Sequence, residues 1–280
     1  MKKALIGILL AITLAASLVG CGGNEKAVSG NEEKKVIKIG ATAGPFEEIA
    51  NVVKELASKE GIELKVVTFN DYIVPNRALD KGEIDVNAYQ NIPFLKQFNK
   101  DHGTDIVPLG KTVAMLMGIY TKKYNSVDEL PEGATVGLQN DPVNRSRALH
   151  VYQNAGLIKL KPGTDEDKAT VQDIAENPKN LKFKEMESGM LARTLTSLDA
   201  STINGNYALQ EGYKPKEDAI YLNNEDKYTN VVAVNRKDKD NEIYKRIAEL
   251  YTSEEVKKFI EEKYNGVVIV AEDPFNIDFE

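Results

Sequence analysis

Cysteine is nearly missing from this chain of 280 residues: it occurs once, as Cys21. A single cysteine excludes an intramolecular disulfide, so the fold has to be stabilised by its hydrophobic core. Histidine is almost as scarce, with only His102 and His150. Because a transition-metal site needs a cluster of histidine, cysteine or carboxylate ligands, we expect neither a metal site nor a cofactor.

Enzyme motifs and basic segments are missing as well. Neither histidine belongs to a nucleophile–base arrangement, and no Gly-x-Ser-x-Gly turn or phosphate-binding glycine loop occurs. We therefore predict that the chain is not an enzyme and has no catalytic residues. Its 36 Lys and Arg stand against 43 Asp and Glu, a net charge of −7 without a concentrated basic block. This balance predicts no nucleic-acid partner.

The chain begins with an export signal. Lys2 and Lys3 precede an uncharged apolar run at 4–19 that is too short to span a membrane comfortably. The run ends in Leu-Val-Gly-Cys at 18–21, which resembles a bacterial lipobox. That resemblance implies cleavage before Cys21 and acylation of its thiol, so the protein is expected on the extracytoplasmic face of a membrane, anchored by lipid. A signal peptide with an incidental cysteine is the alternative.

The rest of the sequence divides into a tether and two similar halves. Residues 1–20 are the predicted signal peptide, and residues 21–35 are the lipidated cysteine with a polar, flexible tether. Residues 36–121 and 122–225 are predicted as the first part of lobe 1 and as lobe 2, and residues 226–280 as a segment that crosses back to lobe 1. Cleavage removes two lysines and leaves a net charge of −9.

Strand and helix signals alternate in both halves. Strands are predicted at 36–40, 62–69, 84–86, 134–137, 181–186 and 199–204, and helices at 45–60, 75–81, 141–155, 190–198, 241–250 and 253–263. This alternation predicts an α/β protein with two lobes, each a mostly parallel sheet flanked by helices, and a ligand cleft between them. Two independent domains without a functional cleft are the alternative.

The predicted helix at 141–155 carries the clearest binding signal. Asp141 can cap it and Pro142 suits its first turn. Asn144 and Arg147 are three residues apart and share a face, and Arg147 can grip a carboxylate in bidentate fashion near the helix N-terminus. Arg145 points away and is expected to be solvated. A surface salt bridge is the alternative role for either arginine.

Further candidates follow predicted strands. Tyr72 and Tyr89 come after predicted strands of the first half. Their rings could flank the apolar part of a ligand while their hydroxyls keep hydrogen bonds. Asn204 and Asn206 hold the matching position in the second half, and Asn230 lies in a segment that reads as a strand crossing back. Ordinary half-buried tyrosines are the alternative.

These segments carry a family resemblance. Phe-Asn-Asp-Tyr-x-x-Pro-Asn at 69–76, Asp-x-Asn-Ala-Tyr-Gln at 85–90, Asn-Asp-Pro-x-Asn-x-x-Arg at 140–147, Glu-Asn-Pro-Lys-Asn-Leu at 176–181 and Tyr-x-Asn at 228–230 resemble the NlpA/MetQ family. The resemblance runs from about residue 36 to 270. It implies a two-lobed periplasmic-binding-protein fold that captures L- or D-methionine, or a related small apolar amino acid, and delivers it as a monomer to an ABC permease and its ATPase.

The resemblance also implies roles for single residues. Arg147 is expected to bind the ligand carboxylate, Asn204 and Asn230 its polar backbone groups, and Tyr72 and Tyr89 its side chain, with Asn144 beside Arg147. The family commonly has histidine where this chain has Asn91, which is also a candidate ligand-binding residue and leaves a methionyl dipeptide open. A surface-exposed structural or adhesive lipoprotein is the alternative from another class.

Overall fold

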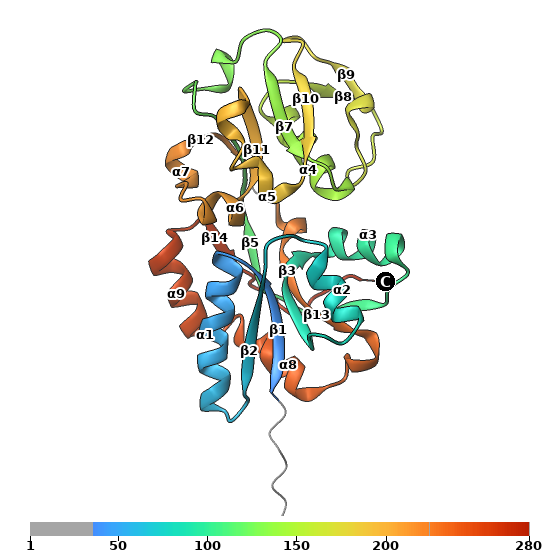
Figure 1. Cartoon of the computed structure of the whole chain (residues 1–280), viewed down its shortest axis with the longest axis vertical. Helices are drawn as coiled ribbons and strands as arrows, with labels where there is room; N and C mark the ends of the chain where they lie inside the picture. Colours follow the sequence, from blue (N-terminus) through green and yellow to red (C-terminus); the bar gives the residue numbers. More distant parts are fainter. Residues whose placement is uncertain (1–35, 224, 280) are drawn as a thin grey trace, which may run out of the picture. The chain divides into compact units, whose positions relative to one another are not determined.

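The computed structural model describes residues 36–223 and 225–279. The signal peptide, Cys21 and the tether are predictions that lie outside the described residues. The described part contains two five-stranded sheets (Figure 1). We call the first sheet with its helices lobe 1 and the second sheet with its helices lobe 2.

Lobe 1 is built on a mixed sheet. Its strands, in spatial order, are β2 (Leu64–Phe69), β1 (Ile37–Thr42), β3 (Val86–Asn91), β13 (Asn230–Asn235) and β4 (Ile106–Lys111). β1 pairs in parallel with β2 and β3, whereas β13 pairs antiparallel with β3 and β4. The late strand β13 therefore lies between β3 and β4 in a sheet whose other strands come from the first part of the chain.

Lobe 2 repeats this plan. Its strands, in spatial order, are β10 (Lys182–Met186), β7 (Thr135–Gln139), β11 (Ala200–Asn204), β6 (Met117–Tyr120) and β12 (Ala219–Asn223). β7 is parallel to β10 and β11, and β6 is antiparallel to β11 and β12. The α/β class with two sheets is confirmed, and in each sheet two antiparallel pairings accompany the parallel core.

The chain crosses between the lobes beside short strands. β5 (Val113–Met115) is separated from β6 by Leu116 alone, and it pairs with β14 (Val268–Val270) near the C-terminus. β13 joins the sheet of lobe 1, and the return of residues 226–280 to that lobe as a domain stays a prediction. The lobe boundaries at 121 and 225 stay predictions. A small hairpin joins β8 (Lys159–Leu160) and β9 (Ile174–Glu176).

Helices cover the sheets. They are α1 (Pro45–Lys59), α2 (Val74–Asp80), α3 (Ile92–His102), α4 (Pro142–Asn154), α5 (Ser188–Leu191), α6 (Gly205–Gln210), α7 (Pro215–Asp218), α8 (Glu242–Leu250) and α9 (Glu254–Tyr264). Most predicted helices and strands are confirmed to within a few residues. β3 is a correction, because it begins at Val86 rather than residue 84 and runs on to Asn91.

A second correction concerns residues 190–198, predicted as one helix. The chain forms the short α5 and then a 3₁₀ turn at Leu195–Ser197. The physical reason is local, because Thr194, Thr196 and Ser197 have low helix propensity and their hydroxyls compete for backbone groups. Thr194 Oγ1 donates to the carbonyl of Met190, and Ser197 Oγ donates to that of Thr194.

Alternate residues of β13 face two cores of lobe 1. Val232 and Val234 pack with α1, α8 and α9, whereas Val231 and Ala233 pack with α2 and α3. Lobe 2 has its own core around β7 and α4. Among the residues described, no helix is both long and apolar enough to cross a membrane.

Candidate functional site

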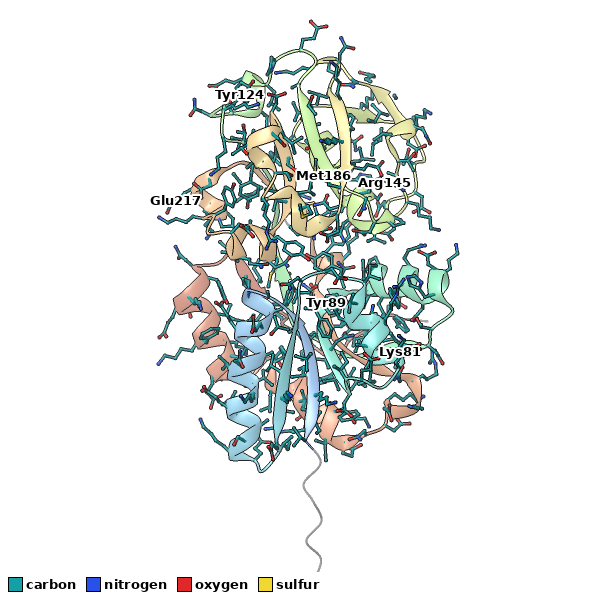
Figure 2. All side chains as sticks on the ribbon, in the orientation of Figure 1. Lys81, Tyr89, Tyr124, Arg145, Met186 and Glu217 are labelled. Carbon is teal, nitrogen blue, oxygen red and sulfur yellow. The ribbon has the colours of Figure 1, made fainter. Side chains whose placement is uncertain are left out.

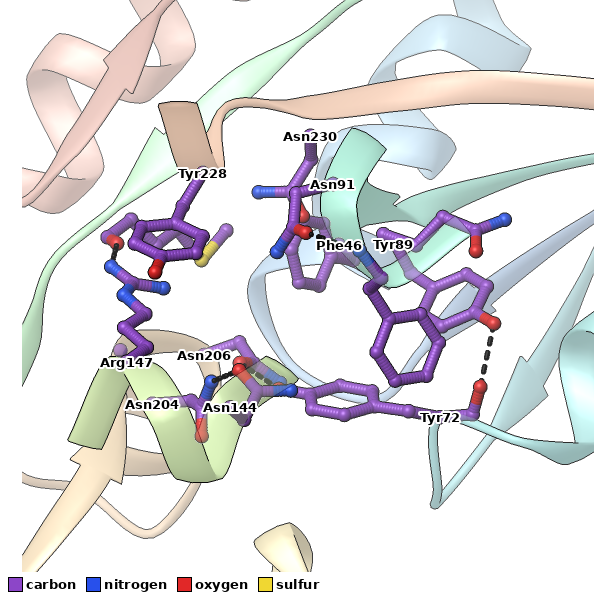
Figure 3. A pocket seen from close by; sticks show the side chains of 14 residues that line it. Phe46, Tyr72, Tyr89, Asn91, Asn144, Arg147, Asn204, Asn206, Tyr228 and Asn230 are labelled. Carbon is purple, nitrogen blue, oxygen red and sulfur yellow. Dashed lines mark hydrogen bonds between the residues drawn. The ribbon is translucent and has the colours of Figure 1, made fainter. Parts of the chain in front are cut away.

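A cavity lies between the lobes (Figure 3). Side chains from both lobes line it, and this lining includes all seven predicted ligand-binding residues: Tyr72, Tyr89, Asn91, Asn144, Arg147, Asn204 and Asn230. These residues come from segments far apart in the sequence. Whether they bind a ligand stays a prediction, but the fold brings them together.

Aromatic rings form the lobe 1 side of the cavity. The ring centroids of Tyr72 and Tyr89 lie 6.0 Å apart in a stacked pair, and Phe94 meets Tyr72 edge-on at 6.0 Å. The Tyr89 hydroxyl donates to the main-chain oxygen of Tyr72 at 2.6 Å. Burial raises the pKa of both tyrosines well above its usual value, so both hydroxyls stay protonated. These rings form a neutral, apolar wall of fixed geometry, and the amides of Gln90, Asn91 and Asn230 from the same lobe lie beside it.

Arg147 is the cationic group of the lobe 2 side. The side chain is 5% exposed, and its Nη2 donates to the main-chain oxygen of Met115 at 3.0 Å. Its guanidinium carbon lies 4.3 Å from the ring centroid of Tyr228, a cation–π distance. Burial lowers the pKa of Arg147, and the neighbouring Tyr228 and Glu225 oppose that shift.

The guanidinium also has unused donors. Arg147 Nε is buried and has no hydrogen-bond partner among the described residues. Leaving a charged donor without a partner is costly, so a structure that keeps one in a cavity is suited to an anionic ligand. A carboxylate is the planar acceptor that fits this fork.

Asn144 and Asn204 lie beside Arg147 and are bonded to each other. Asn204 Nδ2 donates to Asn144 Oδ1 at 2.8 Å, and both side chains are buried. Asp141 caps α4, accepting from the Asn144 main-chain nitrogen at 2.9 Å. The predicted cap is present, and it uses the main-chain N–H of Asn144. Arg147, rather than that N–H, therefore offers the donors for an anion.

Asn91 and Asn230 face each other across two antiparallel strands. They are register partners in the pairing of β3 with β13. Asn91 Oδ1 accepts from the Phe94 main-chain nitrogen at 3.0 Å, so this residue is the N-cap of α3. Asn230 Nδ2 donates to the main-chain oxygen of Val113 at 2.8 Å. Each amide therefore has one end fixed by backbone and another available to the cavity.

Hydrogen bonds join the two lobes beside Tyr72, one of them from the Tyr207 hydroxyl to the main-chain oxygen of Asn70 at 3.3 Å. The Tyr72 hydroxyl donates to Asn206 Oδ1 at 2.6 Å, and Asn206 Nδ2 is buried without a partner among the residues described. Asn206 follows a predicted strand but is not among the predicted binding residues. Its position after that strand is its signal in the sequence.

The sequence prediction missed other parts of the lining. Phe46 belongs to an apolar helical stripe that reads as core, and Tyr228 stands two residues before Asn230. Gly205 has a steric role, since a Cβ there would lie 2.5 Å from the main-chain oxygen of Leu116 at the crossing between lobes. The other missed residues are Gln90, Phe94, Met115 and Asn206.

Two polar residues of α4 have no place in the cavity lining. Arg145 donates to Glu185 at 3.3 Å, as expected of a surface pair. Figure 2 shows Arg145 on lobe 2, whereas Tyr89 lies between the lobes. His150 is half-buried, and burial lowers its pKa. Within the described ranges no group of three His, Cys, Asp or Glu side chains could hold a metal ion.

Comparison with known proteins gives consistent matches. The NlpA lipoprotein family matches residues 37–271. The D-methionine-binding lipoprotein MetQ of Escherichia coli (strain K12) is 40% identical over 254 residues, which cover 89% of this chain and 91% of the relative.

Solved structures of binding proteins are also similar to this chain. A nutrient binding protein from Burkholderia cenocepacia bound to methionine superimposes with a TM-score of 0.82 at 44% identity, covering 84% of this chain and 100% of that one. The periplasmic substrate-binding protein of an ABC transporter from Coxiella burnetii gives a TM-score of 0.81 at 36% identity, with coverage of 84% and 100%. The periplasmic-binding-protein fold expected from the sequence is thus confirmed.

Proposed function

The chain belongs to the NlpA lipoprotein family, and we propose that it is the substrate-binding protein of an ABC importer for methionine. The observation that carries this proposal is the buried Arg147 with an unused donor, in a cavity that also has an aromatic wall. One side of the cavity suits a carboxylate and the other an apolar side chain. This pairing fits a small apolar amino acid.

We infer how such a ligand lies in the cavity. Its carboxylate binds Arg147, and its backbone groups bond the amides of Asn204 and Asn230. Its thioether lies among Tyr72, Tyr89 and Phe94, since sulfur makes favourable contacts with aromatic rings. L-methionine, D-methionine and a methionyl dipeptide all share these features and are separated by experiment.

The cellular setting follows from the family and the N-terminal sequence. A chain with a lipobox-like Leu-Val-Gly-Cys at 18–21 is anchored to a membrane through Cys21 and works on the extracytoplasmic face. It works as a monomer that delivers its ligand to a membrane permease driven by an ATPase. Its role is capture and delivery rather than catalysis.

Ligand-induced stabilisation tests the proposal. Protein freed of carried-over ligand by unfolding and refolding is screened by thermal shift against L-methionine, D-methionine and methionyl dipeptides, with glutamate as the matched control. A ligand at 100 times its dissociation constant should stabilise the protein by about 2.7 kcal/mol. Glutamate should stabilise it far less, because its second carboxylate meets the aromatic wall. If none of the methionine compounds raises the melting temperature, the importer role is wrong.

A further inference from the structure

The cavity lining has an unbalanced charge. Arg147 is its cationic residue, and none of the lining residues in the described ranges carries a carboxylate. An α-amino acid brings an ammonium as well as a carboxylate. In a buried site that ammonium needs either an anionic neighbour or well-oriented oxygen acceptors.

Asp141 lies directly behind the cavity wall. Asn144 Nδ2 is 3.1 Å from both carboxylate oxygens of Asp141, and Ser188 Oγ donates to Asp141 Oδ2 at 3.4 Å. Burial raises the pKa of Asp141, and the hydrogen bonds from Asn144 and Ser188 oppose that shift by favouring the ionised form. An ionised carboxylate only accepts hydrogen bonds, so the nitrogen of the Asn144 amide faces it. The oxygen of the same amide then faces the other way.

The hydrogen bonds that continue from Asn144 all point toward Asp141, because each amide oxygen accepts from the next residue of the series. Asn144 Oδ1 accepts from Asn204 Nδ2 at 2.8 Å, and Asn204 Oδ1 accepts from Gln139 Nε2 at 2.8 Å. Gln139 Oε1 accepts from the Thr202 hydroxyl at 3.2 Å. Each amide is therefore oriented by its neighbour, and the series ends on the charge of Asp141. Asn144 and Asn204 lie together on the Arg147 side of the cavity (Figure 3).

This orientation decides what Asn144 offers to a ligand. After accepting from Asn204, its Oδ1 keeps a second lone pair, and Asn144 lines the cavity one helical turn before Arg147. An amide polarised by a carboxylate at its nitrogen end is a stronger acceptor at its oxygen end. An acceptor next to a guanidinium matches the ammonium and carboxylate that share one carbon in an α-amino acid.

We propose that Asp141 is a positioning residue that makes the site selective for a free α-ammonium group, acting through the oriented amide of Asn144. This inference rests on the proposed function and deepens it. It assigns the counter-charge of the ligand ammonium to a residue outside the cavity lining. A ligand that keeps the carboxylate and thioether but lacks the amine gains nothing from Asp141.

Calorimetry with two ligands and one isosteric variant tests this. The ligands are methionine and desaminomethionine, which lacks only the amino group, and the variant is Asp141→Asn. Asparagine is also a good N-cap, so α4 keeps its cap while the charge is lost. Wild-type protein should prefer methionine by about tenfold to a hundredfold, the effect of one hydrogen bond to a charged group. In Asp141→Asn this preference should fall toward one, with desaminomethionine binding nearly as in wild type.

Two further variants serve as controls for lost charge. Asp71 caps the turn before α2, accepting from the main-chain nitrogens of Ile73 and Val74, so Asp71→Asn removes a nearby carboxylate without touching Asn144. Glu225 lies near Arg147 and accepts from Asn223 Nδ2 at 2.7 Å, which makes it the rival counter-charge. Neither Asp71→Asn nor Glu225→Gln should change the preference. Asp141→Ser, a second capping variant without charge, repeats the test if Asp141→Asn fails to fold.

The outcomes separate this inference from the proposed function. If Asp141→Asn weakens both ligands equally, the residue is only a helix cap. If it changes neither affinity, the residue has no role in binding. Loss of preference in Glu225→Gln instead would assign the counter-charge there. In each of these cases methionine still binds wild-type protein and the proposed function stands. Wild-type protein that binds no methionine overturns the proposed function and this inference with it.

Discussion

The two lobes share a strand plan but present different chemistry to the cavity between them. Both lobes contribute amides, but the rings of Phe46, Tyr72, Tyr89 and Phe94 come from lobe 1 and the cation Arg147 comes from lobe 2. The rings form an apolar wall, and Arg147 with its neighbouring amides forms a polar wall. A ligand with one apolar and one zwitterionic end contacts both walls, so its binding favours the state in which the lobes are held together.

Buried amide networks differ between the lobes in the same way. In lobe 1, Asn76, Asn87 and Gln90 bond one another at 2.6–2.9 Å, and the described bonds among these side chains involve no charged group. In lobe 2 the corresponding network ends on the carboxylate of Asp141. The neutral network supports the position of Tyr89 and Asn91 on β3. The charged network in addition sets which end of each amide faces the cavity.

The largest effect is expected from breaking the polar wall. Arg147→Ala removes the guanidinium fork and leaves the ligand carboxylate desolvated, so binding should weaken by about 2–5 kcal/mol. Arg147→Lys should also bind poorly, because an ammonium does not reproduce two parallel bonds. Calorimetry measures both.

Arg145→Ala is the control for this pair. Its guanidinium contacts Glu185 and the main-chain oxygen of Ala169 rather than the cavity, so affinity should stay within error of wild type. Similar losses of affinity at Arg145 and Arg147 would show that the total charge of α4 matters and that no single arginine binds the ligand carboxylate.

A stability effect comes next and concerns the neutral network of lobe 1. Asn87 is fully buried, donating to Asn76 and accepting from Gln90. Asn87→Ala leaves both partners short of a bond, so the free energy of unfolding should fall by about 1–3 kcal/mol. Denaturant unfolding measures it, and the exposed Asn125→Ala should stay within about 0.5 kcal/mol of wild type. Equal stability of the two variants would mean that this network contributes little.

Much of this comparison could be predicted from the sequence, and the reasons are local. The stripe of Phe46, Ile49, Val53 and Leu56 predicts α1, and Asp141 with Pro142 predicts the start of α4; both are confirmed. Arg147 could be singled out because its position relative to a helix start is a local property. The family resemblance then added Asn204 and Asn230, which local patterns alone leave ambiguous.

The rest depends on contacts between distant segments. Phe46 reads as core from its periodicity and also lines the cavity, because α1 begins where β1 ends at the cavity edge. The bond from Tyr72 to Asn206 joins residues 134 positions apart, and no pattern near either residue specifies it. The direction of the amide series from Asp141 likewise follows only from the positions of β7, β11 and α4 together.

A smaller effect is expected from the bond that joins the two walls. Tyr72→Phe keeps the stacked ring but removes the hydroxyl that donates to Asn206, so affinity should fall by about 1 kcal/mol. We expect wild-type protein to contract on binding as the lobes rotate about their crossing segments, which small-angle scattering reads as a smaller radius of gyration. In Tyr72→Phe this contraction should be reduced.

Tyr89→Phe is the matched control for closure. Its hydroxyl bonds the Tyr72 main chain within lobe 1, so its loss leaves the contact between lobes in place. Contraction should then match wild type even if affinity falls somewhat. If wild-type protein binds methionine tightly and its scattering does not change, the lobes are closed before binding and the ligand does not drive closure.

The smallest effect on binding is expected from the residue that defines the anchor. Cys21 lies outside the described residues, and the segment 22–35 that follows it is predicted as a tether without a role in the cavity. Cys21→Ala should abolish labelling by an alkyne fatty acid and leave the precursor uncleaved or the protein unattached, while methionine affinity stays unchanged. Cys21→Ser, the closest isostere of the thiol, should behave alike because the acyl chain needs the sulfur. A wild-type protein that takes up no label would remove the lipid anchor, and weakened binding in either variant would mean that the tether contributes to the site.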